Sequence, residues 1–371
     1  MSEVRGMRKI LLAAVLFAVV PLFAFPCFAS EGEEKLISKA LEGQEMIFAR
    51  RYDDALKLFD ELKRDYPDSP AGWFGKMAVL EMRMFEREDF HLSEEFEAEA
   101  KEGSAKVAGV LMRYSPSTWD LFLAGSLLGL DGFYKARKGQ WWGAYTAGGK
   151  SRQIFRRVKG MDPSFVDADF GLGMYIYWRS VFSREISFLR IFPDRRAEGT
   201  SIVERVANDG RFAKELARVN LGIMHLEDRR FAEARRIFAG YVARYPGSVI
   251  LRQLLGRSLL QLKKYKEAVG QFREVLKIDP ELKKPHYFIG AALVLLGDPK
   301  GFAEAEAELQ KFLEMEKGGK YWPSYARYWL GRLAELKGDK VSAKEHYDAA
   351  TALNPKVKDA ARRARGMGGG I

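Results

Sequence analysis

Two adjacent segments, residues 215–248 and 249–282, match each other position by position, and this repetition limits the possible folds more than any other feature. Each segment carries a glycine, an alanine, a phenylalanine and a proline in the same register, and each recurs 34 residues later: Gly222 and Gly256, Ala234 and Ala268, Phe238 and Phe272, Pro246 and Pro280. A fixed period of this length indicates a stack of similar units, not one globular core.

The residue types at these positions predict a pair of helices in each unit. Gly222 lies in an apolar helical pattern, where glycine costs about 1 kcal/mol relative to alanine, so a close approach of the second helix must require it. Ala234 supplies the small surface on that second helix, and Phe238, one turn later, fills the space between units. Pro246 cannot continue a helix and sets the turn into the next unit. Because one helical pair cannot bury its apolar face, such units are stable only when stacked.

The period and these markers resemble the tetratricopeptide repeat (TPR) family. The same signature recurs in a first unit near the N-terminus and in a last unit near the C-terminus: Gly43, Ala55, Phe59, Pro67, and Gly331, Ala343, Tyr347, Pro355. The resemblance implies an all-α solenoid of helical hairpins. It also implies that the first helix of each unit lines an inner groove where a ligand binds.

The section from Tyr114 to Phe192 is rich in aromatic residues and glycine and diverges from the repeat. Its run from Asp167 to Trp178 resembles a segment of exported bacterial TPR proteins of unassigned activity. Three interpretations stay open for the aromatic block. It could be a thick apolar core, a partner-binding or glycan-binding surface, or a contact with a membrane surface through Trp141 and Trp142 near three cations: Lys135, Arg137 and Lys138.

The N-terminal residues predict an export signal. Arg5, Arg8 and Lys9 precede an apolar run from residue 10 to 25, and Ala29 closes a small-residue cleavage site. The run is short for a membrane span of roughly 20 residues. Cleavage after Ala29 would remove Cys27, the one cysteine of the chain, and so exclude disulfides and thiolate metal sites.

The expected organisation follows from these patterns. It begins with a signal peptide (1–29), followed by N-terminal TPR-like units (30–105) that include an acidic helix or long insertion at residues 86–102. A divergent helical section (106–214) and a C-terminal TPR array (215–357) come next. Residues 358–371 form a polar capping helix and a disordered tail that begins at Gly366.

Charge is unevenly distributed along the chain: residues 31–102 carry a net charge of −9 and residues 106–371 a net charge of +18. Such asymmetry favours an acidic partner, an anionic surface or pairing between the two ends of the chain.

Motifs of catalysis and of metal or cofactor binding are not found in the sequence. The four histidines lack a second ligand at metal spacing, and the glycines at 171 and 173 lack the third glycine of a dinucleotide fingerprint. Phosphate loops, calcium loops and nucleophile elbows are also missing. We therefore expect no enzyme activity, no cofactor and no metal.

The TPR resemblance implies that the second, fifth, ninth and twelfth positions of each unit face a ligand. In the C-terminal array these positions hold six candidate contact residues: Gln253, Arg257, Tyr287, Tyr325, Tyr328 and Arg332. Arginine and tyrosine suit an extended peptide or an acidic segment. In the unit from Glu215 the same positions are all apolar, which predicts that another part of the chain covers them: Leu216, Val219, Ile223 and Leu226.

The sequence thus predicts a non-catalytic, exported TPR scaffold that binds a protein or peptide partner in the cell envelope. It would be periplasmic or secreted. Two alternatives remain: a protein that associates peripherally with the envelope membrane, and one that binds glycans or other polymers through the tryptophan-rich section. Nucleic acid is not expected as a partner, because an exported protein would rarely meet it.

Overall fold

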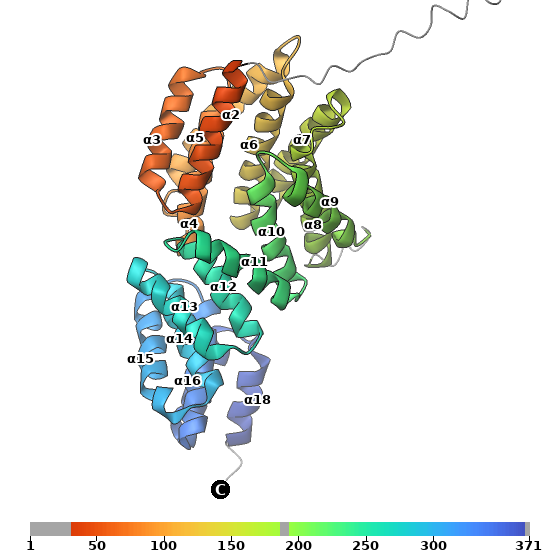
Figure 1. The fold of residues 1–371 in the computed structure, drawn as a ribbon. Helices are drawn as coiled ribbons and strands as arrows, with labels where there is room; N and C mark the ends of the chain where they lie inside the picture. The colour runs from red at the N-terminus through yellow and green to blue at the C-terminus, as the bar shows by residue number, and fades with distance from the viewer. Residues whose placement is uncertain (1–30, 186–192, 368–371) are drawn as a thin grey trace, which may run out of the picture.

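The structure is a computed structural model that describes residues 31–185 and 193–367; the predicted signal peptide and the last four residues lie outside this range. The described residues form seventeen α-helices and one short 3-10 helix, with no strand among them. Figure 1 shows them as an elongated stack. The helices are α2 (Glu31–Phe48), α3 (Tyr52–Asp65), α4 (Ala71–Arg87), α5 (Ser93–Met112), α6 (Thr118–Arg137), α7 (Trp141–Met161), α8 (Asp167–Glu185), α9 (Arg196–Asp209), α10 (Lys214–Glu227), α11 (Phe231–Arg244), α12 (Val249–Gln261), α13 (Tyr265–Ile278), α14 (Lys283–Leu296), η2 (Pro299–Gly301), α15 (Phe302–Met315), α16 (Tyr321–Lys337), α17 (Lys340–Leu353) and α18 (Lys358–Met367).

Each helix packs mainly against the helices before and after it, from α2 to α18. The described chain is therefore a series of eight helical hairpins, α2/α3 to α16/α17, closed by α18. Contacts restricted to neighbouring units are the mark of a solenoid. The predicted all-α solenoid of helical hairpins is confirmed.

The signature glycines face the signature aromatic rings. A Cβ atom added at Gly222 would lie 2.6 Å from the Phe238 ring, and Phe238 is fully buried. The same relation holds for the pairs Gly43 and Phe59, Gly256 and Phe272, and Gly331 and Tyr347. At these crossings any larger residue would push the two helices of the hairpin apart.

The divergent section keeps this packing in an elongated form. Phe155 of α7 is wedged between Gly125 of α6 and Gly171 of α8, where added Cβ atoms would lie 2.9 and 2.0 Å from its ring. Gly125 and Ser151 are 26 residues apart, whereas Gly222 and Ala234 are 12 apart. The additional residues lengthen the hairpin, since α6 and α7 have 20 and 21 residues and α10 and α11 have 14 each.

Two expectations from the sequence need correction. The acidic stretch is neither an exposed helix nor an insertion: α5 is the second helix of a regular hairpin, and its fully buried Phe96 stacks on Tyr134 with 4.1 Å between ring centroids. The boundary expected after residue 105 therefore falls inside α5. The disordered tail was also expected to begin at Gly366, but α18 continues to Met367.

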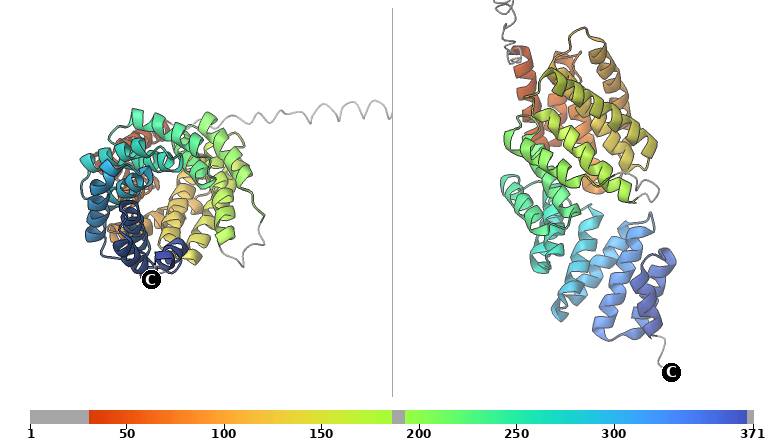
Figure 2. Two further views of the ribbon diagram at one scale, coloured as in Figure 1. Left: turned by 90° about the horizontal axis from the view of Figure 1, so that it is seen from below. Right: turned by 90° about the vertical axis from the view of Figure 1, so that its right-hand side faces the viewer.

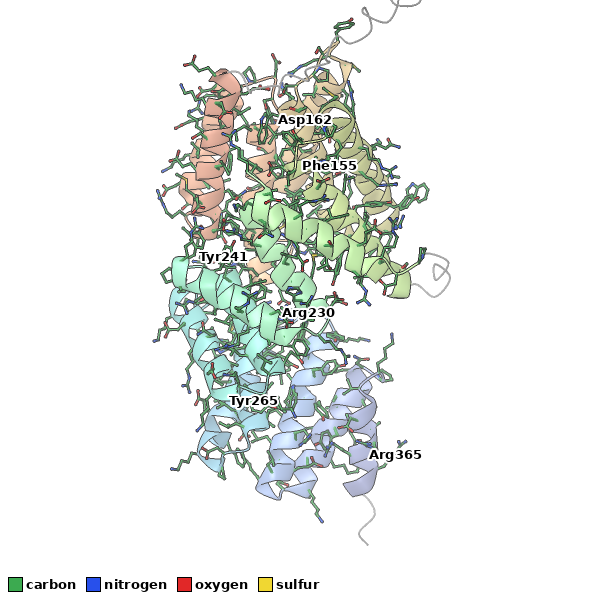
Figure 3. The ribbon with its side chains drawn as sticks, turned by 45° about the vertical axis from the view of Figure 1, so that its right-hand side comes forward. Phe155, Asp162, Arg230, Tyr241, Tyr265 and Arg365 are labelled. Atoms are coloured by element: carbon green, nitrogen blue, oxygen red, sulfur yellow. The ribbon has the colours of Figure 1, made fainter. Side chains whose placement is uncertain are left out.

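The N-terminal hairpin also touches helices far along the chain. Glu45 of α2 accepts hydrogen bonds from Arg244 (2.8 Å) and from the Tyr245 hydroxyl (2.5 Å), about 200 residues away. Gln44 donates to the carbonyl of Phe212 at 3.3 Å. Seen from below in Figure 2, the helices follow a ring, which brings the first hairpin against the middle of the chain. In Figure 3, Phe155 lies in the upper half, Tyr241 near the junction of the halves and Arg365 on α18.

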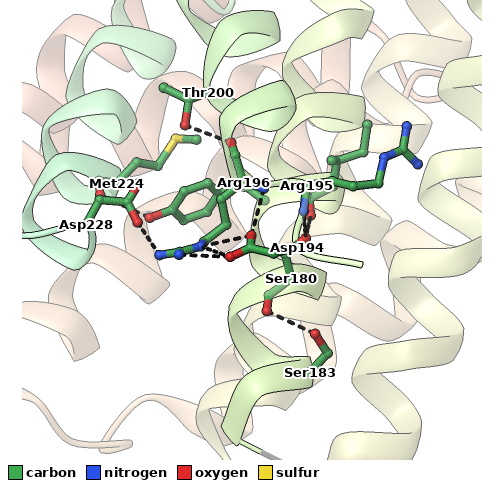
Figure 4. A network of polar contacts seen from close by, with 10 residues as sticks. Ser180, Ser183, Asp194, Arg195, Arg196, Thr200, Met224 and Asp228 are labelled. Carbon is green, nitrogen blue, oxygen red and sulfur yellow. Dashed lines mark hydrogen bonds and ion pairs between the residues drawn. The ribbon is translucent and has the colours of Figure 1, made fainter. Parts of the chain in front are cut away.

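A polar network fixes the joint between the divergent section and the C-terminal array. Figure 4 shows Arg196 at the start of α9 between two carboxylates, Asp194 at 2.9 Å and Asp228 after α10 at 2.5 Å. The buried hydroxyl of Tyr177 on α8 donates to the carbonyl of Met224 on α10 at 3.0 Å. Three successive helices are thus held together by more than apolar packing.

Candidate partner-binding surface

The inner positions of α10 are half-buried. Leu216, Val219, Ile223 and Leu226 pack against the apolar cluster of the C-terminal array, and Met82 and Phe85 of α4 pack against the same cluster. The expectation that another part of the chain covers this unit stays a prediction.

The next inner position, Gln253 on α12, contacts the end of α4. Gln253 is buried, and its side-chain amide donates to the carbonyl of Glu86 at 3.3 Å. The prediction that Gln253 contacts a partner is thus not met in this structure, because the chain itself fills the place of the partner.

Arg50 joins the first hairpin, α4 and the C-terminal array. Its guanidinium lies 3.1 Å from the Glu86 carboxylate and 2.7 Å from the carboxylate of Asp279, which follows α13. The Tyr52 hydroxyl donates to Glu86 at 2.7 Å. Burial raises the pKa of the Glu86 carboxyl, and the hydrogen bonds from Tyr52 and Arg50 oppose this rise. This shared set of partners fixes the end of α4 on the inner face.

Lys284, at the second position of its unit, is a buried cation in the middle of the inner face. Its Nζ lies 3.6 Å from the centre of the Trp322 ring and 3.8 Å from a carboxylate oxygen of Glu88. Burial lowers the pKa of Lys284 to about 8; Glu88 and Glu316 oppose this effect, while the charges of Lys283 and Arg257 add to it. Sequence reasoning missed Lys284, although its place in the repeat was the signal that could have found it.

Tyr287, a predicted contact residue, is buried and unavailable to a partner. Its hydroxyl accepts a hydrogen bond from the indole nitrogen of Trp329 at 3.0 Å. The rings of Trp322 and Phe312 pack edge-on against it, with 5.1 and 5.5 Å between centroids. In this unit the ring of the tyrosine has become part of the core between α14 and α16.

Tyr328 and Arg332 are half-buried beside the capping helix α18. The Tyr328 hydroxyl donates to Asp359 of α18 at 2.8 Å, and hydrogen bonds from Arg363 and Tyr328 lower the pKa of Asp359 to about 2. The Nε of Arg332 lies 3.3 Å from Glu335, which also binds Arg363 of α18 at 2.8 Å. The cap thus binds Tyr328 directly, and Arg332 and the cap share Glu335 as a partner.

Arg257 and Tyr325 are the predicted contact residues that remain open. Arg257 is exposed and forms no ion pair with a described residue. Tyr325 is half-buried, and its ring lies 5.0 Å from that of Tyr321, which is 57% exposed. We define the inner-face patch as Arg257, Lys284, Tyr321 and Tyr325; Trp322 connects Lys284 to the two tyrosines.

The helices that carry the inner-face patch have few acidic residues. The charged residues of α12 and α14 are all basic, and Glu335 is the one acidic residue of α16. The patch therefore combines cations with aromatic rings, which are the side chains that recognise carboxylates and apolar groups together.

The aromatic block of the divergent section divides between core and surface. Trp119 and Tyr177 are buried, whereas Trp141, Trp142 and Tyr145 are exposed at the start of α7. The exposed aromatic residues of the block also include Tyr114 and Phe133, so the described part of the block is neither all core nor all surface.

A cleft of about 340 Å³ lies among α9, α10 and α11, and His225 in its wall is buried, which lowers the pKa of its imidazole. Within the described ranges, no three metal-ligating side chains are placed to hold an ion. Over the same residues, no helix has the length and apolar character that crossing a membrane requires.

Comparisons with known proteins identify the repeats. Two family profiles, both described as tetratricopeptide repeat, match the chain, one over residues 216–282 and 290–358 and the other over residues 41–69. No curated protein matches the chain.

Several solved structures are similar to the chain to different degrees. The crystal structure of the APC/C hetero-tetramer Cut9-Hcn1 has a TM-score of 0.59 and 13% sequence identity, covering 88% of this chain and 54% of that one. The chain thus spans about half of that relative, and at this identity the likeness concerns the fold alone. The pilF protein of Pseudomonas aeruginosa has a TM-score of 0.44 and 20% identity, covering 64% and 94% of the two chains. TTC0263 of Thermus thermophilus has a TM-score of 0.39 and 19% identity, covering 53% and 98%.

Proposed function

Because the chain belongs to the tetratricopeptide-repeat family, whose repeats suggest a scaffold for protein–protein interaction, we propose that it holds an acidic segment of a partner protein on the inner-face patch. The TPR fold is typically a non-catalytic scaffold, and the proposal includes no catalytic step.

One observation carries the proposal: the inner face already holds an acidic segment of the chain itself. The end of α4 places Glu86 and Glu88 beside Arg50 and Lys284, and Met82 and Phe85 in the adjacent apolar cluster. An acidic segment with apolar residues can therefore bind one part of this surface. The inner-face patch continues it with Arg257, Tyr321 and Tyr325, which support recognition of a similar segment from another protein.

The proposal extends to location, which rests on the N-terminal residues. The basic, apolar and small residues of positions 1–29 support export into the cell envelope or beyond it. Mass spectrometry of the protein from its native cells, after fractionation, checks this. A chain that begins at Ser30 outside the cytoplasm is expected, and an uncleaved cytoplasmic chain would contradict it.

Photo-crosslinking in cells tests the partner-binding surface. A crosslinking amino acid in place of Arg257 is expected to capture a partner with an acidic segment. The control position is Lys266 on α13, which is exposed and has no ion pair with a described residue. The captured segment is then synthesised and titrated against the purified protein. We expect Arg257→Gln with Tyr325→Ala to weaken its binding at least tenfold, since hydrogen bonds to charged groups contribute about 1.5–3 kcal/mol each. Equal capture at both positions, or unchanged affinity, would reject the surface.

A further inference from the structure

The second helix of the elongated hairpin, α7, has no acidic residue along its 21 positions. Its charged residues are Lys150, Arg152, Arg156, Arg157 and Lys159. Lys159 pairs with Asp169 of α8, and Arg152 lies over the Tyr175 ring. The other three cations form no ion pair with any described residue. Unpaired cations on a helix without acidic residues leave a local positive field that the fold does not neutralise.

These three cations share one face of α7 with exposed aromatic residues. Ala147, Ile154, Phe155 and Val158 are buried against the neighbouring helices. The opposite face bears Trp142 (78% exposed), Tyr145 (62% exposed) and the three exposed cations. The rings of Trp142 and Tyr145 stack with 6.0 Å between centroids. We call this exposed face the α7 strip: Trp142, Tyr145, Lys150, Arg156 and Arg157.

The cations singled out in the sequence near Trp141 and Trp142 are not those of the α7 strip. Lys135 pairs with Asp131 at 2.5 Å, Arg137 with Glu81 at 2.6 Å, and Lys138 with Glu97 at 2.7 Å. Arg137 and Lys138 thus join the end of α6 to α4 and α5, and Lys135 is paired within α6. The charge available to a ligand lies further along the chain, on the next helix.

We propose that the α7 strip docks on the surface of an anionic lipid bilayer. Arginine and lysine bind lipid phosphates through charge-assisted hydrogen bonds. Tryptophan and tyrosine favour the interface between headgroups and acyl chains because one end of each side chain is apolar and the other polar. The protein would lie on the bilayer without crossing it.

The shape and charge of the strip favour a bilayer over an acidic protein. No atom lies within 4 Å of a Cβ atom added at Gly149 or at Gly160. The α7 strip is therefore shallow between its long side chains. A shallow strip whose charges all have one sign fits a flat, uniformly anionic surface. This docking is independent of the inner-face patch, which lies on α12, α14 and α16.

Vesicle flotation tests the proposal. Since the apolar run of residues 10–25 could itself bind lipid, the chain that begins at Ser30 is measured beside the full chain. The Ser30 chain is expected to float with vesicles containing phosphatidylglycerol and not with phosphatidylcholine alone. Changing Lys150, Arg156 and Arg157 together to glutamine should lower the partition coefficient about a hundredfold. Trp142→Ala with Tyr145→Ala should weaken flotation and remove the lipid-induced blue shift of tryptophan fluorescence.

The matched control removes the same charge elsewhere. Lys57, Arg64 and Lys266 are exposed and have no ion pair with described residues, so their combined change to glutamine should leave flotation within about threefold of the wild type, as expected for general charge alone. Failure of the unmodified Ser30 chain to float, equal flotation with neutral vesicles, or an equal loss in the control would each overturn the proposal. Binding to polyglutamate without flotation would instead assign the strip to an acidic protein. The Arg257→Gln, Tyr325→Ala variant should float normally, whatever happens to partner binding.

Discussion

At the scale of the residue, Lys284 shows how one buried charge makes stability depend on pH. Its pKa in the folded protein is about 8, against a usual value of 10.5. Below pH 8 the amine is charged in both the folded and the unfolded chain. From pH 8 to 10.5 the unfolded chain binds the additional proton, so the free energy of unfolding rises with pH over this window.

We therefore predict a pH-dependent difference between the wild type and Lys284→Met. From pH 7.5 to 10 the free energy of unfolding of the wild type should rise relative to that of the variant, by at most about 3 kcal/mol. Urea unfolding at several pH values measures this. Lys266→Met, at an exposed lysine of α13, is the control and should show a flat difference. A flat difference for Lys284→Met as well would show that the amine is solvated.

At the scale of the element, the contact of α7 with α8 depends on the absence of a side chain at Gly171. We predict that Gly171→Ala lowers the free energy of unfolding by about 1–3 kcal/mol, because its Cβ would lie 2.0 Å from the Phe155 ring. Gly149→Ala in α7 is the control: nothing lies within 4 Å of its added Cβ, so it should stabilise by up to about 1 kcal/mol. Similar results for both variants would contradict the packing. Urea unfolding of each variant decides between them.

The elements show what could be read from the sequence and what could not. Gly222, Phe238 and their counterparts predict hairpins because a local period reports local packing. The sequence did not predict the hairpin of α4 and α5. In α5 a single phenylalanine, Phe96, stands among acidic residues in place of the alanine and aromatic pair of the repeat. The packing of Phe155 between Gly125 and Gly171 was only partly predicted, because the additional residues between Gly125 and Ser151 interrupt the spacing of the repeat. No local period reports a contact such as that of Gln253 with Glu86, which joins residues 167 positions apart.

At the scale of the whole molecule, the set of Arg50, Glu86 and Asp279 joins the first hairpins to the C-terminal array. We predict that Arg50→Met lowers the free energy of unfolding by about 3 kcal/mol, because it leaves the buried Glu86 carboxylate without its cation. It should also increase hydrogen exchange at the ends of α4 and α12. Glu86→Gln added to Arg50→Met should recover part of the loss, because no charge then stays buried.

The control for this prediction is the adjacent residue. Arg51 is exposed, and its ion pair with Asp54 is local, so Arg51→Met should change stability by less than about 1 kcal/mol. An Arg50→Met variant as stable as Arg51→Met would mean that the two halves do not depend on this set of contacts.

The contact of Glu45 with Arg244 and Tyr245 also determines how the molecule would respond to mechanical tension. A force that pulls α2 away from α18 reaches this contact before the helices between Glu45 and Tyr245, and the ion pair of Arg50 with Asp279 forms a second bridge over nearly the same span. Rupture of both contacts would release about 200 residues, roughly 650 Å of extended chain if they unfold. A chain anchored at one end and bound to a partner at the other would therefore behave as a stiff strut at low force and as a long tether beyond a threshold.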